Sequence, residues 1–407
     1  MPLDLDYVRA QFPGLAGDWV AFDNAGGSQI LAGVVERIND FLLHSNVQTG
    51  ASYERSELAG ARVREAQSRI ATLINARRPE EVIMGPSTTM LLHLLAEAMA
   101  PRFAAGDEIV VTNCDHEANI GPWMGLRTRG VAVRSWEVDP DSLELELEAL
   151  DRLMTPRTRL VCLTHASNIL GTINRAAEIA AFVHARGAKL CVDAVAYAPH
   201  RIVDVQAWDV DYYVLSFYKV YGPHHAVLYG RYDDLCALDS LNHFFIAADD
   251  VPYKFQPGNL NYELAYGCIG IVDYLEELGR RAGAGEGARA RLQAGFEAIA
   301  AHEEALAARL LDYLRGKNRV RIIGRSQADR AIRVPTVSFV VDGHDSAAIV
   351  RHTDRFGIGI RYGDFYARRL IEDLGLSAQN GVVRVSMVHY NTPGEVDRLI
   401  QHLDEVL

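Results

Sequence analysis

One lysine, Lys219, stands inside a run of apolar and aromatic residues, Ser216-Phe217-Tyr218-Lys219-Val220-Tyr221, which ends at Gly222-Pro223. Burial disfavours the charged form of an amine, so a lysine in a partly desolvated pocket becomes a nucleophile toward aldehydes. The alternative is a surface lysine whose stem lies on apolar neighbours while its ammonium group reaches water. The run offers no packing reason for a lysine, which favours the nucleophile.

Two further polar residues follow apolar runs. Asp193 closes the run 189–192, where a carboxylate is costly to bury without a partner. A protonated pyridine nitrogen is such a partner, and the pair turns an aromatic cofactor into an electron sink. Asn168 follows the run 160–163, and its amide is able to donate to a ring oxygen. Taken singly, Asp193 also fits a helix cap and Asn168 a turn.

An anion site and an imidazole complete the set. Thr88 and Thr89 directly precede a helical pattern, and N–H groups and hydroxyls at a helix N-terminus bind phosphate, although a plain N-cap gives the same pattern. His116 follows the run 108–112 and is suited to stack on an aromatic ligand or to transfer a proton, although a lone loop histidine is usually a surface residue. The phosphate, ring face, ring oxygen, ring nitrogen and aldehyde of pyridoxal 5'-phosphate thus each have a candidate partner.

These candidates gain weight from the elements that must position them. Short apolar runs alternate with helical patterns, such as 90–99 and 175–186, from about residue 81 to residue 231. The predicted strands are residues 82–84, 108–112, 131–138, 160–163, 189–192, 212–216 and 226–229. The alternation is typical of an α/β fold with a mainly parallel sheet covered on both faces. Ligands of such sheets lie beyond the carboxyl ends of the strands, where all these candidates are expected.

A second, smaller α/β unit is predicted after a long helical region, residues 265–278 and 288–314. Its predicted elements are strands at 320–323, 336–341, 358–361 and 382–387, and helices at 346–356 and 392–406. Thr392-Pro393-Gly394-Glu395 has the form of a capping box with proline just inside the helix. We therefore divide the chain into an N-terminal segment packing with the small domain (1–20), a large cofactor-binding domain (21–275), and a linker helix with the small C-terminal domain (276–407).

The composition excludes several classes of protein. The 407 residues are 49% hydrophobic and 23% charged, as in an ordinary globular enzyme, and the net charge of -12 argues against a nucleic-acid partner. We expect a cytoplasmic protein without signal peptide or membrane span, because the N-terminus is acidic and no apolar run reaches ~18 residues. The five cysteines form no CxxC pair, which indicates reduced thiols, and His224-His225 lacks a third ligand for a metal.

Longer motifs surround the same candidates. The most specific are Asp115-His116-Glu117-Ala118-Asn119, Ser167-Asn168-Ile169-Leu170-Gly171-Thr172, Val192-Asp193 and Lys219 with Tyr221-Gly222-Pro223. On these motifs the chain resembles the class V aminotransferase family of fold-type I pyridoxal phosphate enzymes, most of all the group with cysteine desulfurases and selenocysteine lyases. The resemblance implies a large domain with a mainly parallel seven-stranded sheet and a small α/β C-terminal domain.

The resemblance also implies a role for each candidate. Lys219 would bond covalently to the aldehyde carbon of the cofactor, His116 would stack on the ring and move protons, and Asp193 would pair with the ring nitrogen. Asn168 would lie near the ring oxygen or the substrate. The phosphate would be held by Thr88, Thr89, Ser216 and Tyr218, the last standing where desulfurases usually have a histidine.

Arginines are implied at the substrate end. Arg384 matches the family arginine whose guanidinium fork clamps the substrate carboxylate, and Arg361 matches a second arginine near the substrate. Desulfurases carry a catalytic cysteine in the loop after the arginine that Arg361 matches. Here that position is Tyr366, and no cysteine follows Cys268. A tyrosine hydroxyl cannot accept sulfane sulfur, so Tyr366 is expected to border the substrate instead.

Two other departures concern the cofactor. Ala196 stands where the family has a glutamine three residues after the aspartate, so one hydrogen bond to the cofactor is lost. Asn259 stands in the family's Gly-Thr loop, whose threonine reaches the phosphate of the partner subunit. The resemblance therefore implies a homodimer in which Asn259 contributes to the partner's cofactor site.

These residues predict a pyridoxal phosphate enzyme that acts on a small amino acid. The resemblance favours desulfurase-like C–S lyase chemistry without a persulfide cysteine, with class V aminotransferase as the alternative. Epimerisation is a further alternative, because one cofactor supports all three reactions and the protein selects among them by orientation. A binding homologue without catalysis is disfavoured by the joint presence of Lys219, Asp193 and His116.

Overall fold

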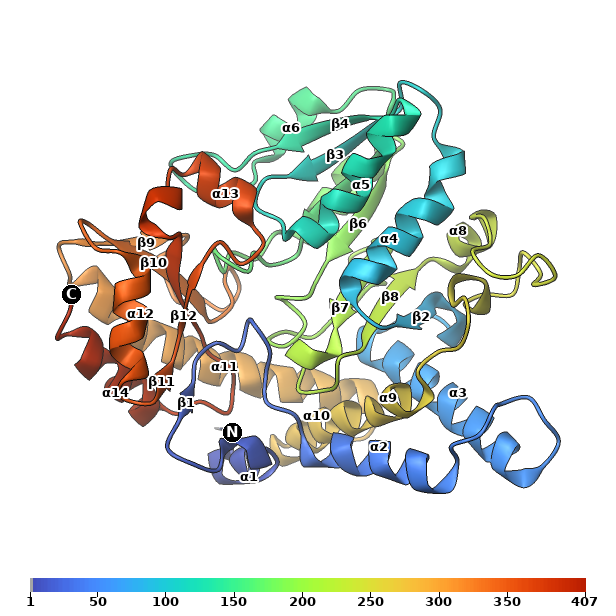
Figure 1. Ribbon diagram of the computed structural model, residues 1–407, viewed down its shortest axis with the longest axis horizontal. Helices are drawn as coiled ribbons and strands as arrows, with labels where there is room; N and C mark the ends of the chain where they lie inside the picture. The colour runs from blue at the N-terminus through green and yellow to red at the C-terminus, as the bar shows by residue number, and fades with distance from the viewer. Residues whose placement is uncertain (1–2) are drawn as a thin grey trace.

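Seven short strands form the central sheet of the protein, for which the computed structural model describes residues 3–407 (Figure 1). Their order across the sheet is β2-β8-β7-β6-β5-β3-β4. The strands are β2 (Val82–Gly85), β3 (Glu108–Thr112), β4 (Ala132–Trp136), β5 (Thr158–Thr164), β6 (Lys189–Asp193), β7 (Tyr212–Ser216) and β8 (Ala226–Gly230). The predicted mainly parallel sheet is confirmed, with strand ends within two residues of the sequence prediction.

One strand of the sheet, β8, is antiparallel to its neighbours, and the turn that leads into it contains Lys219. β8 runs antiparallel to both β7 and β2, whereas β4, β3, β5, β6 and β7 are parallel to one another. The connection from Ser216 to Ala226 is too short for the crossover helix that a parallel neighbour needs, so the chain turns back directly. Lys219 lies in this turn, in a short 3-10 helix, Phe217–Lys219.

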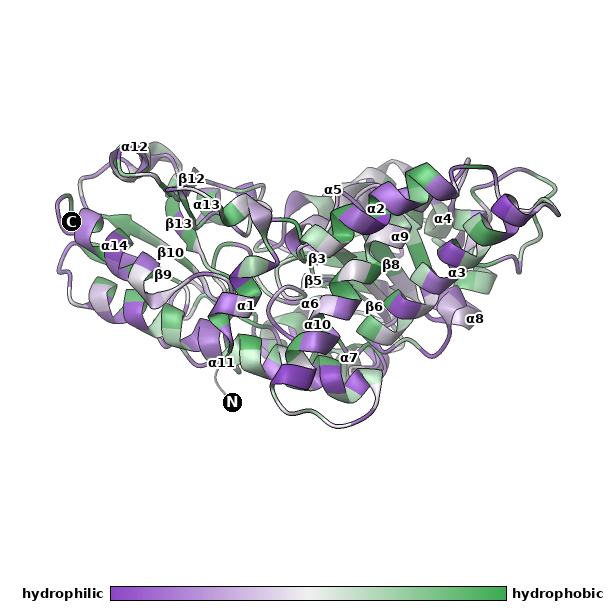
Figure 2. Ribbon diagram, turned by 90° about the horizontal axis from the view of Figure 1, so that it is seen from below, coloured by the Kyte–Doolittle hydropathy of each residue, from purple (hydrophilic) through white to green (hydrophobic). Residues whose placement is uncertain are grey.

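Apolar layers cover both faces of the sheet because its strands are apolar on both sides. Val82 and Met84 belong to one core and Ile83 between them to the other, as the alternation of a strand requires. Helices of the large unit pack on these layers: α2 (Ala32–His44), α3 (Glu54–Ile74), α4 (Thr88–Met99), α5 (Gly121–Gly125), α6 (Leu147–Leu153), α7 (Ala176–His184) and α8 (Tyr232–Ala237). In Figure 2 the helices alternate polar and apolar residues, whereas central strands such as β8 are mostly apolar.

The C-terminal part contains a four-stranded antiparallel sheet of order β12-β13-β10-β9. Its elements are β9 (Val320–Ile323), β10 (Thr336–Val341), α12 (Ser346–Asp354), β12 (Arg361–Gly363), α13 (Arg368–Asp373), β13 (Val382–Ser386) and α14 (Pro393–Leu403). The predicted capping box is confirmed, because Thr392 accepts from the Glu395 N–H and the Glu395 side chain accepts from the Thr392 N–H. This sheet brings the two candidate arginines together, since Arg361 lies directly opposite Arg384.

The predicted single strand at residues 358–361 is wrong. β11 (Ile358–Gly359) pairs in parallel with β1 (Val20–Ala21), and β12 begins only at Arg361, in the four-stranded sheet. The chain passes from one sheet to the other at the buried Ile360. Pairing with a strand more than 300 residues earlier leaves no mark in the local pattern, which is why one apolar run was predicted as one strand.

Helices join the two parts. α1 (Leu5–Ala10) lies near the N-terminus, and the predicted helix at 265–278 is two consecutive helices, α9 (Tyr262–Gly267) and α10 (Ile269–Arg281). The 28-residue α11 (Ala288–Arg315) runs along the lower side of Figure 1 beneath both sheets. Its first half supplies Leu292 and Phe296 to the core of the large sheet, and its second half supplies Leu310 and Leu314 to the small one.

Candidate active site

The turn after β7 buries Lys219. The side chain is 8% exposed, and its Nζ has no hydrogen-bond partner anywhere in residues 3–407. Burial, and to a smaller extent the Arg384 guanidinium, lower the pKa of Lys219 to about 8, although the Asp193 carboxylate partly opposes this shift. The turn is fixed by Tyr221, whose hydroxyl donates to the Pro199 carbonyl at 2.6 Å. The result is a buried amine that is partly neutral near pH 8 and free to react.

Asp193 lies at the carboxyl end of β6, the strand next to β7, which leads into the lysine turn. Its Oδ1 accepts from the backbone N–H of Val195 at 2.8 Å, and no donor to Oδ2 occurs within the described part of the chain. Burial raises the pKa of Asp193 to about 6, while the Val195 N–H and the charge of Lys219 oppose the rise. One carboxylate oxygen therefore remains available to a cationic group in the pocket.

His116 is held as a neutral imidazole. The Ala118 N–H donates to its Nδ1 at 3.0 Å, so the ring proton must sit on Nε2. Burial lowers the pKa of His116 to about 4, helped by the positive charges of Lys219 and Arg384. A neutral ring with a fixed tautomer offers a flat face and one N–H donor to a ligand.

The anion end of the site is the first turn of α4. Ser87 caps the helix by accepting from the Met90 N–H at 3.1 Å, and the Thr88 and Ser216 hydroxyls are 2.7 Å apart. The first N–H groups of a helix lack carbonyl partners and favour a negative ligand. Thr89 belongs to the same turn, so the predicted phosphate contacts converge here.

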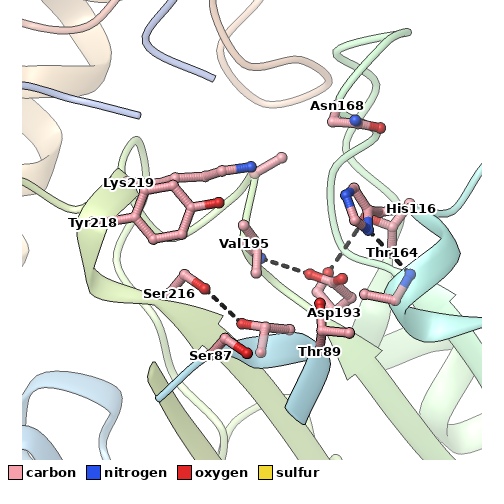
Figure 3. Close-up of a pocket in the computed structure, with 13 residues that line it drawn as sticks. Ser87, Thr89, His116, Thr164, Asn168, Asp193, Val195, Ser216, Tyr218 and Lys219 are labelled. Atoms are coloured by element: carbon pink, nitrogen blue, oxygen red, sulfur yellow. Dashed lines mark hydrogen bonds between the residues drawn. The ribbon is translucent and has the colours of Figure 1, made fainter. Parts of the chain in front are cut away.

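Figure 3 shows these side chains pointing into one pocket. The pocket is lined by Ser87, Thr88, Thr89, His116, Ala118, Thr164, Asn168, Asp193, Val195, Ala196, Ser216, Tyr218 and Lys219. The chain thus brings together the predicted phosphate, ring and lysine residues. Val195 and Thr164 were missed as site residues; Val195 acts through a backbone N–H, which no side-chain motif reports. Ala196 also faces the pocket, as expected for a position without the family glutamine.

The substrate end is built around Arg384 on β13. Its side chain is 2% exposed and donates through Nη2 to Asp23 Oδ1 at 2.9 Å and through Nη1 to the Asn168 carbonyl at 3.3 Å. Its Nε is buried without a partner, as is Asn168 Oδ1. Burial lowers the pKa of Arg384 to about 10, which Asp23 partly offsets. An unpaired guanidinium N–H in a closed site suits a carboxylate ligand.

Asp23 is a participant that the sequence reasoning missed. Its second oxygen is 3.5 Å from Nη1 of Arg361, so one carboxylate lies between both candidate arginines. Arg361 is half exposed, in contrast to Arg384. Its contact with β13 joins residues 361 positions apart, which no local sequence pattern reports.

The loop after β12 covers this end. Phe365 and Tyr366 both adopt positive φ, 52° and 61°, a region that costs side-chain-bearing residues energy. The Phe365 ring lies 3.7 Å from the Arg384 guanidinium carbon, and its carbonyl accepts from Asn168 Nδ2 at 2.9 Å. Tyr366 is 70% exposed, with its ring centre 5.1 Å from that of His116. Tyr366 thus borders the mouth, and no cysteine lines the pocket.

Among the predicted site residues, Arg384, Arg361 and Tyr366 lie beside the pocket without lining it, whereas Asn259 lies away from it. Asn259 is exposed and exchanges hydrogen bonds with Gln48 at 3.2 and 3.3 Å, away from the pocket of its own chain. Its predicted role concerns the pocket of a partner subunit and stays a prediction.

The donor set fits pyridoxal 5'-phosphate. Lys219 would hold the aldehyde carbon, Asp193 the ring nitrogen, His116 the ring face, and the first turn of α4 with Ser216 the phosphate. The free carboxylate oxygen of Asp193 and the unpartnered amine of Lys219 are the atoms that such a group requires. Among residues 3–407, no three His, Cys, Asp or Glu side chains are grouped to hold a metal ion, and no helix has the length and apolarity to cross a membrane.

Comparisons with known proteins agree with this fit. The family described as aminotransferase class-V matches residues 20–399. The chain is 42% identical to an aminotransferase-like protein, FGM3, of Gibberella zeae, over 99% of this chain and 98% of that protein. It is 35% identical to a cysteine desulfurase-like protein, ustD, of Aspergillus flavus, over 100% of this chain and 91% of that one. The solved structure of a cysteine desulfurase from Thermococcus onnurineus matches with a TM-score of 0.88 at 25% identity, covering 100% and 98% of the two chains.

The match extends over both sheets and over every strand end that carries a candidate side chain. Together, the site and the matched residues assign the chain to the class V aminotransferase family, and it is a fold-type I enzyme that depends on pyridoxal 5'-phosphate.

Proposed function

We propose that the enzyme acts on a small α-amino acid and removes its β-substituent by C–S lyase chemistry, without forming a persulfide on the protein. This proposal is supported by the absence of a cysteine at the mouth of the pocket, among the residues that the structure describes. Tyr366 stands in the loop where the related desulfurases are expected to hold their thiol, and the pocket lining contains no cysteine. A sulfur-containing leaving group would therefore depart as a small molecule.

The charge and burial of each site residue suggest its role in the proposed reaction. When bound, pyridoxal 5'-phosphate supplies an aldehyde that takes up amines and a ring that withdraws electrons from the α-carbon. Arg384 binds the α-carboxylate, because its buried Nε lacks a hydrogen-bond partner. Lys219, with its pKa lowered to about 8, takes the α-proton at Nζ. Asp193 would hold the proton of the ring nitrogen, and neutral His116 would present its flat face to the ring.

Transamination is the second candidate. It is supported by the 42% identity with a protein described as aminotransferase-like. Both reactions need the same Lys219, Asp193 and Arg384. They differ in where the proton returns and in whether the β-substituent leaves.

A titration with a panel of amino acids separates the two candidates. The visible absorbance of the cofactor-loaded enzyme is followed, and keto acid, alanine, pyruvate, ammonia and sulfide are measured in the product. Release of sulfide with pyruvate and ammonia, after a transient spectral change, supports the lyase. A stable spectral change that only a keto acid reverses supports the aminotransferase. The Lys219→Ala variant is the control and should show neither.

We also propose that the enzyme is a homodimer in which Asn259 reaches the partner's phosphate site. A hollow beside Asn259 is lined by Pro86 and Met90, which flank the phosphate-binding turn of α4. Phe244, in the preceding loop, is 99% exposed, an unusual state for a large apolar side chain in a monomer. Sedimentation of the wild type and of Phe244→Ser tests this; a monomeric wild type would contradict it.

We further propose that the chain divides into a large domain, residues 21–275, and a linker helix with a small domain, residues 276–407. We also propose that the enzyme is cytoplasmic. The division is supported by the separate apolar cores of the two sheets.

A further inference from the structure

A second carboxylate, Asp115, is buried next to the cofactor site, and no step above uses it. It follows β3, directly precedes His116, and is 1% exposed. We propose that Asp115 is a positioning residue that fixes the His116 ring over the cofactor and supplies a second negative charge behind Asp193. The proposal depends on the cofactor site alone, not on which of the two reactions follows.

All contacts of the Asp115 carboxylate come from donors. The Thr164 N–H donates to Oδ2 at 2.9 Å and Asn119 Nδ2 to Oδ1 at 2.7 Å. The Thr112 hydroxyl also donates to Oδ2, and it accepts from the Asp115 N–H at 3.0 Å, which directs its own hydrogen toward the carboxylate. A carboxyl group surrounded only by donors is arranged for its ionised form.

The same contacts determine the position of His116. Asp115 and Asn119 are joined across a turn of four residues, and His116 lies inside that turn. The Ala118 N–H of the same turn fixes Nδ1 of the imidazole. The indole N–H of Trp123 approaches Asn119 Oδ1 at 3.5 Å and ties the turn to α5. The orientation of the imidazole is therefore set by a closed turn whose first residue is Asp115.

The end of β5 links Asp115 to Asp193. Thr164 is the register partner of Asp193, its N–H binds Asp115, and its hydroxyl lies 3.4 Å from the Asp193 carbonyl. Thr164, which lines the pocket, thus contacts the Asp115 carboxylate and the backbone of Asp193. The titratable groups facing Asp115 are Asp193 on β6, Cys162 on β5 and its neighbour Cys114. Burial raises the pKa of Asp115 to about 7, and Asp193 contributes to the rise.

A second buried negative charge favours any proton on the ring nitrogen and on the lysine nitrogen beside it. Removing that charge should make these nitrogens less basic. In the Asp115→Asn variant we expect the pH midpoint of the visible absorbance of the cofactor-loaded protein to fall by about one unit. The variant should also bind pyridoxal 5'-phosphate more weakly, by about tenfold, because the imidazole is no longer held in place.

The matched control is Glu108→Gln. Glu108 is the buried carboxylate at the opposite end of β3, bound by Arg134 at 2.8 Å and by Thr155 at 2.8 Å. Its loss should lower the melting temperature without moving the absorbance midpoint. Asp115→Glu, which keeps the charge, should restore part of the wild-type midpoint.

A folded Asp115→Asn protein with the wild-type midpoint overturns the proposal, and so does an equal shift in Glu108→Gln. If Asp115→Asn does not fold, Thr112→Val is measured instead. That variant removes one donor, raises the pKa of Asp115 and should move the midpoint in the same direction. An unmoved midpoint there overturns the proposal as well. Absence of sulfide or keto acid from the wild type would refute the proposed reaction and leave this test intact.

Discussion

The floor and the mouth of the pocket are built in opposite ways. The floor consists of Lys219 and Asp193, which are buried, and of the partly buried His116, all at the ends of strands in one sheet. Backbone N–H groups fix the side chains of His116 and Asp193. The mouth joins residues from distant parts of the chain, Asp23 and Arg384, beneath the exposed Tyr366. From this difference we infer that the floor sets the cofactor chemistry, and we propose that the mouth sets the choice of substrate.

The largest effect is expected at the floor. Lys219→Ala should lower kcat by about 10³-fold or more and abolish the visible absorbance of the covalently held cofactor, because the variant loses both the nucleophile and the base. Absorbance spectra and turnover with the best amino acid of the panel measure this. Retained turnover in the variant would contradict the assignment of the floor.

Arg384→Ala tests the buried part of the mouth. We expect kcat/KM to fall by about 10²-fold, mainly through KM, because the variant loses the guanidinium group proposed to bind the substrate carboxylate. Cofactor binding should change much less, because Arg384 does not line the pocket that would hold the cofactor. Arg361→Ala is the comparison, since the half-exposed Arg361 should contribute less than tenfold. Equal losses of kcat/KM in the two variants would contradict the expectation that the buried Arg384 contributes more to substrate binding than the exposed Arg361.

The buried amine of Lys219 should also make the free energy of unfolding depend on pH. The pKa of Lys219 falls from 10.5 to about 8 on folding, so between these values the unfolded chain binds the proton and the folded chain does not. Stability of the cofactor-free protein from this group therefore rises with pH from about 8 to 10.5, by about 2 kcal/mol. Lys219→Met should lack this rise. Urea unfolding of both proteins at pH 7.5 and 10 measures the difference, and parallel curves would show that the amine is not desolvated.

The smallest effect is expected at the rim. Tyr366→Ala should change kcat/KM for individual amino acids by less than about tenfold and alter their ranking, because 70% of the residue is exposed. The absorbance of the bound cofactor should not change. A large loss for all substrates alike would place Tyr366 in the chemistry of the floor.

The floor could be predicted from sequence because each of its residues follows a local pattern. Asp193 and Lys219 directly follow buried strands, and the parallel arrangement brings those strand ends to one edge. The mouth could be predicted only in part. Arg384 and Arg361 were inferred from resemblance, whereas Asp23 was missed because its role exists only after β1 and β13 meet.

The same contrast explains the errors in the fold. The capping box at Thr392 is a local signal and was confirmed. The run at 358–361 divides between two sheets, and one of these depends on pairing with Val20 near the other end of the chain. Patterns within a few residues report local structure, but the assignment of a strand to a sheet is a property of the whole fold.

The long helix α11 limits how the enzyme can open. At 28 residues it is about 42 Å long, and its two halves are parts of two different apolar cores. A hinge between the sheets would have to bend this rod or withdraw one half from its core. Entry of the substrate should therefore need only local displacement of the loop around Phe365, leaving the angle between the sheets constant through the reaction cycle.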